Sequence, residues 1–113
     1  MKKLLCAALI ATILPALSGD MAGKILNETG KVFTNEHGTV VRKRLKAGEN
    51  IKRHNHEGDD VIFCVTQGQI RVTLNDSEEH LLKDGDVIQF NGKNYISAEA
   101  VNDTKVVITL IKE

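Results

Sequence analysis

Two histidines and a nearby carboxylate are the residues of this chain best suited to chemistry. His54 and His56 are one residue apart in a stretch typical of a β-strand, and Asp60 follows a glycine turn. Because side chains alternate between the two faces of a strand, both imidazoles should point to the same side. Two imidazoles and one carboxylate suit Fe, Mn, Ni or Zn and leave coordination positions open for a substrate. These three residues therefore predict a divalent-metal site.

Other polar side chains are candidates for lining the same pocket. The arginines among them could orient the carboxylate of a small-molecule substrate, although a solvated strand face is the alternative interpretation of the basic cluster at 42–46. Strand alternation alone does not say which face is inward. No general acid–base pair is evident, so the catalytic residues stay unknown. The pocket candidates are Arg42, Arg44, Arg71, Gln89 and Tyr95.

Short strands must position these residues. Turn residues recur about every eight to twelve positions after residue 26, and no helical periodicity follows the first 22 residues. This pattern is typical of an all-β sandwich or barrel in a single domain. The expected strands cover residues 31–34, 39–45, 51–56, 60–66, 69–74, 78–82, 87–90, 95–100 and 104–111.

Residues 60–66 form the most continuous apolar run after the first 22 residues. Such a run predicts a strand that is buried on both faces. Cys64 lies within it and is expected to act as a small buried hydrophobe. Gln67-Gly68 then predicts a tight hairpin into the strand 69–74.

The N-terminal residues 1–22 are predicted to be a cleaved signal peptide. Lys2 and Lys3 precede an apolar run over residues 4–17, which is shorter than the roughly 20 residues of a membrane span. The mature domain would then be 23–113, exported to the periplasm or secreted, and no longer attached to the membrane. An uncleaved anchor, a buried N-terminal helix, and translation from Met21 to give a cytoplasmic protein are the alternatives.

Charge and size bear on partners. The chain has 15 basic and 15 acidic residues, so nucleic-acid binding has no electrostatic support. A small β domain buries a modest core, and its edge strands must be paired or covered. We therefore expect a homodimer that associates through the outer N-terminal strands.

The chain resembles a small single-domain cupin over about residues 39–111. The family's first motif runs glycine, five residues, His-x-His, three or four residues, glutamate, about six residues and glycine. Here it reads Gly48, His54-Asn55-His56, Asp60 and Gly68, and residues 85–90 resemble the start of the second motif. The resemblance implies a double-stranded β-helix, or jelly-roll barrel, with a metal and a small organic molecule at its mouth.

Two departures from the family pattern affect the implied site. Asp60 stands where a glutamate is usual, and one extra residue separates it from Gly68. Ile96 falls where the family's last metal-binding histidine belongs, which leaves three ligands.

Three functions remain open at this point. One is a metal-dependent enzyme of dioxygenase or isomerase type, and another is a non-catalytic module that binds a small molecule without metal. The third is a barrel packed by Phe63, Ile96 and their neighbours. We expect a small exported metal-binding cupin and leave catalysis open.

Overall fold

The structure is a computed structural model that describes residues 21–113, and every regular element within them is a β-strand. The predicted leader, residues 1–22, lies outside the described residues except for its last two. No helix between residues 21 and 113 is long and apolar enough to cross a membrane. The strands are β1 (Gly30–Asn35), β2 (Gly38–Leu45), β3 (Asn50–His54), β4 (Asp59–Gln67), β5 (Gln69–Leu74), β6 (Glu78–Lys83), β7 (Val87–Asn91), β8 (Ile96–Ala100) and β9 (Thr104–Lys112).

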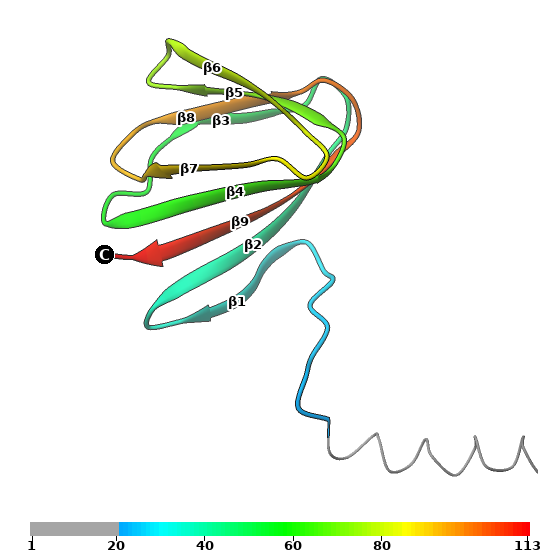
Figure 1. Cartoon of the computed structure of the whole chain (residues 1–113), viewed down its shortest axis with the longest axis vertical. Helices are drawn as coiled ribbons and strands as arrows, with labels where there is room; N and C mark the ends of the chain where they lie inside the picture. The colour runs from blue at the N-terminus through cyan, green and yellow to red at the C-terminus, as the bar shows by residue number, and fades with distance from the viewer. Residues whose placement is uncertain (1–20) are drawn as a thin grey trace, which may run out of the picture.

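The strands form two antiparallel sheets. One has the order β1-β2-β9-β4-β7 and the other the order β3-β8-β5-β6. Figure 1 shows the sheets stacked on each other, with the extended residues 21–29 leading away from β1. The predicted all-β jelly-roll fold is confirmed.

Strand alternation builds the core between the sheets. Val61, Phe63 and Val65 of β4 are almost completely buried, and so are Ile70 and Val72 of β5. In both strands the buried side chains are two residues apart, as one face of a pleated strand requires. Burying one such side chain stabilises the fold by about 1.5–3 kcal/mol.

Two predictions about β4 are wrong. Ile62 and Cys64 are only partly buried, because they point to the outer face of their sheet while their neighbours fill the core. The hairpin with β5 does not form either, since β4 pairs with β7 and β9 while β5 pairs with β6 and β8. Gly68 instead turns the chain from one sheet to the other with φ near 96°. A Cβ there would collide with the backbone of Asp103, so glycine is required for packing as well as for φ.

Candidate functional site

The two histidines come together although they do not share a strand. β3 ends at His54, two residues before the end of the predicted strand 51–56. His56 lies in the connection between β3 and β4. The backbone N–H of His56 donates to the carbonyl of Gly92 over 2.8 Å. His54 Nε2 and His56 Nε2 are 3.0 Å apart, with the rings edge to face.

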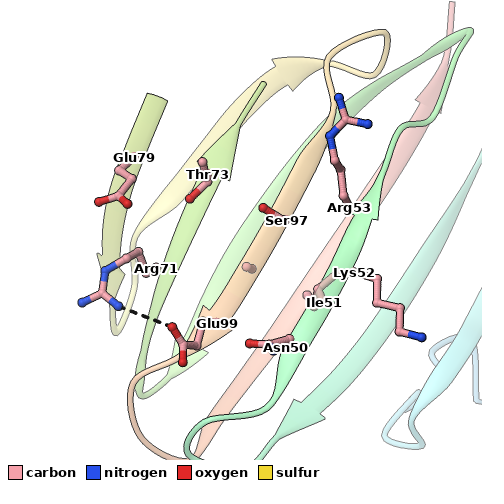
Figure 2. Close-up of a pocket in the computed structure, with 10 residues that line it drawn as sticks. Asn50, Ile51, Lys52, Arg53, Arg71, Thr73, Glu79, Ser97 and Glu99 are labelled. Atoms are coloured by element: carbon pink, nitrogen blue, oxygen red, sulfur yellow. Dashed lines mark ion pairs between the residues drawn. The ribbon is translucent and has the colours of Figure 1, made fainter. Parts of the chain in front are cut away.

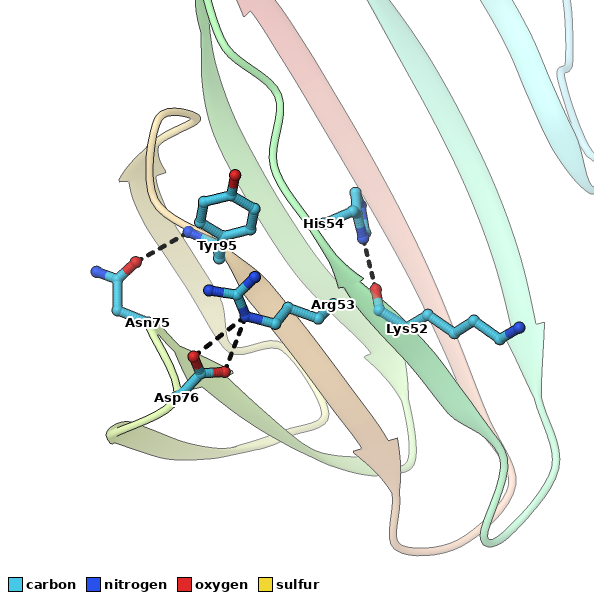
Figure 3. Close-up of polar contacts among 6 residues, drawn as sticks. All are labelled: Lys52, Arg53, His54, Asn75, Asp76 and Tyr95. Carbon is cyan, nitrogen blue, oxygen red and sulfur yellow. Dashed lines mark hydrogen bonds and ion pairs between the residues drawn. The ribbon is translucent and has the colours of Figure 1, made fainter.

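Hydrogen bonds assign a tautomer to each ring. His54 Nδ1 lies 2.7 Å from the carbonyl oxygen of Lys52. Figure 3 marks this hydrogen bond with a dashed line. A carbonyl only accepts, so His54 Nδ1 carries the proton and donates it. In the neutral form of the ring, His54 Nε2 then carries a free electron pair, which accepts from His56 Nε2–H. The pair is thus a directed chain from His56 through His54 to the backbone.

The histidine pair faces a small cavity between the sheets. Its volume is about 100 Å³. Both sheets contribute to its wall, which is hydrocarbon except where the histidines and one lysine meet it. The lining residues are Val41, Lys43, Ile51, His54, His56, Val61, Phe63, Ile96, Ile108 and Leu110.

The structure does not bring Asp60 to the histidines, and that part of the predicted ligand set is wrong. Asp60 lies on β4 between Asp59 and Val61, and the inward positions of this strand are Val61, Phe63 and Val65. Alternation therefore turns Asp60 to the outer face with Ile62. The carboxylate whose charge acts on His56 is Asp59.

Hydrocarbon occupies the positions where further ligands would be needed. Val61 and Ile96 line the cavity beside the histidines and are 1% and 4% exposed. Val61 is separated from Gly68 by six residues, so it takes the motif's carboxylate position better than Asp60 does. Within residues 21–113 no three His, Cys, Asp or Glu side chains are grouped to hold a metal ion. The residues present do not fit a divalent metal with three protein ligands.

Arg71 does not line the cavity, contrary to prediction. It points outward from β5 because Ile70 and Val72 point inward. Figure 2 shows it in a groove on the outer face of the four-stranded sheet, where its guanidinium lies 3.8 Å from the carboxylate of Glu99.

Arg42 and Arg44 are also absent from the cavity wall. Arg42 Nη1 donates to the carbonyl of Glu28 over 3.0 Å. Arg44 lines a different pocket, together with Asp103 and Lys105. On β2 the inward face carries Lys43, which lies between the two arginines in the sequence.

Gln89 and Tyr95 are likewise outside the cavity. Gln89 is exposed because its neighbours on β7 point inward. The ring of Tyr95 lies 4.0 Å from the guanidinium carbon of Arg53, and Arg53 Nε lies 3.0 and 3.1 Å from the carboxylate oxygens of Asp76 (Figure 3). Tyr95 therefore belongs to a surface cluster.

Sequence reasoning missed Lys43 and Asp59. Each shares strand parity with buried or cavity-lining residues, Lys43 with Val41 and Asp59 with Val61. Knowing which face of β2 and β4 is inward would have identified both.

The protonation of His56 should couple to folding. Burial first, and the neighbouring His54 second, lower the pKa of His56 below its ordinary 6.5, while Asp59 opposes the shift. The unfolded chain therefore binds a proton more readily than the folded chain, so the free energy of unfolding should fall as the pH falls below 6.5. Urea denaturation between pH 7.5 and 5.0 measures this slope.

Two substitutions test whether His56 is the source of this acid slope. His56→Gln should flatten the acid slope, whereas His37→Gln, at an exposed turn, should leave it as in the wild type. Equal slopes in all three proteins would contradict this assignment.

Comparisons with known proteins agree with the two-sheet fold described above. The family model described as Cupin domain matches residues 41–111. No curated protein matches the chain. Among solved structures, an RmlC-like cupin family protein with a double-stranded β-helix fold from Methanocaldococcus jannaschii is 18% identical, with a TM-score of 0.71 over 82% of this chain and 94% of the other.

Two further solved structures are similar. KdgF from Halomonas sp. is 25% identical, with a TM-score of 0.67 over 74% of this chain and 76% of its own. A predicted oxalate decarboxylase from Thermotoga maritima is 21% identical, with a TM-score of 0.67 over 74% and 77%.

Proposed function

Since the chain belongs to the cupin domain family, we propose that it is a non-catalytic cupin that holds a small, largely apolar molecule between its sheets without a metal ion. The metal-binding function inferred from the sequence needs a third ligand beside the histidines. Beside the histidines, the described residues present the hydrocarbon side chains of Val61 and Ile96 instead.

One observation carries the proposal. Val61 and Ile96 line the cavity wall that a third and fourth ligand would otherwise occupy around His54 and His56. Neither side chain has an electron pair to donate, and both favour an apolar guest. Moving the apolar surface of a guest from water into a cavity with hydrocarbon walls lowers the free energy, and so favours binding.

The size of the cavity limits the guest. Pockets for drug-sized ligands span about 300–1,000 Å³. This cavity, at about 100 Å³, is closer to an engineered apolar cavity of about 150 Å³ that binds benzene. By proportion it holds about four carbon atoms. Phe63 and Ile96 narrow the cavity, as the packed-barrel hypothesis expected, but they do not close it.

Thermal denaturation with small molecules tests this function. A molecule such as butyramide at ten times its Kd should stabilise the fold by about 1.4 kcal/mol. For a domain of this size that raises Tm by about 5–10 °C. The rise should be the same in EDTA, because no metal takes part.

Two variants localise the effect. Ile96→Phe fills the cavity and should abolish the shift, whereas Ile62→Phe places the same aromatic ring on the outer face of β4 and should retain it. A shift that appears only when metal is added would contradict the proposal.

A metal held by the two histidines alone is the second candidate function. The 3.0 Å between the two Nε2 atoms, and the donation from His54 Nδ1 to a carbonyl, resemble the way that metal-binding histidines are oriented. Elemental analysis of the purified chain tests this candidate. One equivalent of metal that is lost in His54→Ala would favour it over the first.

Self-association is a further proposal, and export through the leader 1–22 stays a prediction from the sequence. β1 is an edge strand with Phe33 about half exposed, and an uncovered apolar edge favours pairing with another copy. Sedimentation at micromolar concentration should therefore find a dimer, and Phe33→Glu should shift it toward monomer. A wild-type monomer would contradict the proposed pairing.

A further inference from the structure

We propose that the guest of the cavity is a short-chain aliphatic carboxylate, with its tail among the hydrocarbon walls and its charge against Lys43. This inference rests on the proposed function and names the chemical class of the ligand.

Lys43 provides an unpaired positive charge at an apolar cavity. It is the one lysine or arginine that lines the cavity in the described part of the chain. The residue as a whole is exposed, so its stem covers the wall while the ammonium group reaches water at the mouth. Among the lysines and arginines of residues 21–113, only Arg53 with Asp76 and Arg71 with Glu99 form ion pairs, so Lys43 is distinguished by its place at the cavity. Lys43 has no ion pair within residues 21–113.

The histidine end of the cavity does not suit an anion. His54 Nδ1–H and His56 Nε2–H are both engaged in the chain of hydrogen bonds, so neither neutral ring has a free donor. The negative charge of Asp59 also acts on His56 and would repel a carboxylate there. A carboxylate without donors is costly to bury. The charged head must therefore lie at the mouth beside Lys43, with the tail pointing inward.

The size of the cavity then limits the length of the carboxylate's aliphatic tail. Room for about four carbons accommodates the tail of butyrate or valerate, whereas hexanoate is too long. Each methylene moved from water into the cavity should tighten binding about fourfold. Affinity should therefore rise from acetate to valerate and stop rising at hexanoate.

NMR titrations of the ¹⁵N-labelled protein with sodium salts of these acids test the inference. Butyramide is the neutral isostere of butyrate and separates charge from apolar contact. An exposed ion pair of about 0.2–1 kcal/mol predicts that butyrate binds about 1.4- to fivefold more tightly than butyramide. The amide signals of Val61, Phe63 and Ile96 should move with the same dissociation constant.

Variants of Lys43 test whether its positive charge binds the carboxylate, with Lys105 as the control. Lys43→Met keeps the aliphatic stem and should reduce butyrate affinity to that of butyramide, while leaving butyramide binding unchanged. Lys43→Arg should retain the preference for butyrate. Lys105→Met removes a lysine from the outer face of β9 and should change nothing.

The outcomes separate this inference from the function on which it rests. If butyramide binds as tightly as butyrate in both wild type and Lys43→Met, the carboxylate assignment is overturned while the apolar binding function stands. If neither compound moves the signals of the cavity residues, both fail.

Discussion

A Val61→Glu, Ile96→His double variant is expected to bind Zn²⁺ or Ni²⁺ at least about a hundredfold more tightly than the wild-type chain. The two substitutions place a carboxylate and a third imidazole beside His54 and His56 in the cavity wall. Removing even an indirect partner of a metal site costs about 10–100-fold in affinity, and here two direct ligands are added. The wild-type pair alone should bind metal weakly.

Neighbouring residues provide matched controls. Ile62→Glu and Ser97→His introduce the same groups one residue away, on the outer faces of β4 and β8. Calorimetric titration should find tight binding only in the cavity variant. The metal-free cavity variant should also be less stable than the wild type, because it buries polar groups without partners, and metal should restore its Tm. Equal affinity in wild type and variant would show that the wall residues do not limit metal binding.

Gly92→Ala is expected to lower the free energy of unfolding by about 1–3 kcal/mol or more and to displace His56. Gly92 holds the turn that carries His56 through two backbone hydrogen bonds, from its N–H to Asp59 and from His56 N–H to its carbonyl. A Cβ at this position would collide with the carbonyl oxygen of His56 and lie 2.6 Å from that of Asp59. Backbone atoms cannot move aside as the end of a side chain can, so the turn must shift.

Urea denaturation and the imidazole NMR signals measure the two effects together. Gly23→Ala is the control, because nothing lies within 4 Å of a Cβ at that position. A Gly92→Ala protein with wild-type stability and an unchanged signal from His56 would contradict the role given to this contact.

The strands were predictable because turn residues and alternating side chains mark them locally. All nine expected ranges overlap the strands that the described residues form. Pairing was harder, because it depends on distant parts of the chain. Gln67-Gly68 resembles a hairpin turn, yet Gly68 lies against Asp103 and directs β5 into the other sheet.

The histidines were identifiable from spacing, but their surroundings depended on which strand faces are inward. Asp60 satisfied a motif that allows three or four residues after the second histidine. The buried series Val61, Phe63 and Val65 turns it away. Lys43 was overlooked for the same reason, because the inward face of β2 carries Val41 and Lys43 and not the two arginines beside them.

The imidazole nitrogens test the central claim most directly. Long-range ¹H–¹⁵N correlation spectra at neutral pH should show His54 protonated at Nδ1 and His56 protonated at Nε2, and one equivalent of Zn²⁺ should leave both patterns in place. Two Nε2 signals that move together to metal-bound positions on adding Zn²⁺ would contradict the claim that this cavity is an apolar binding site without metal.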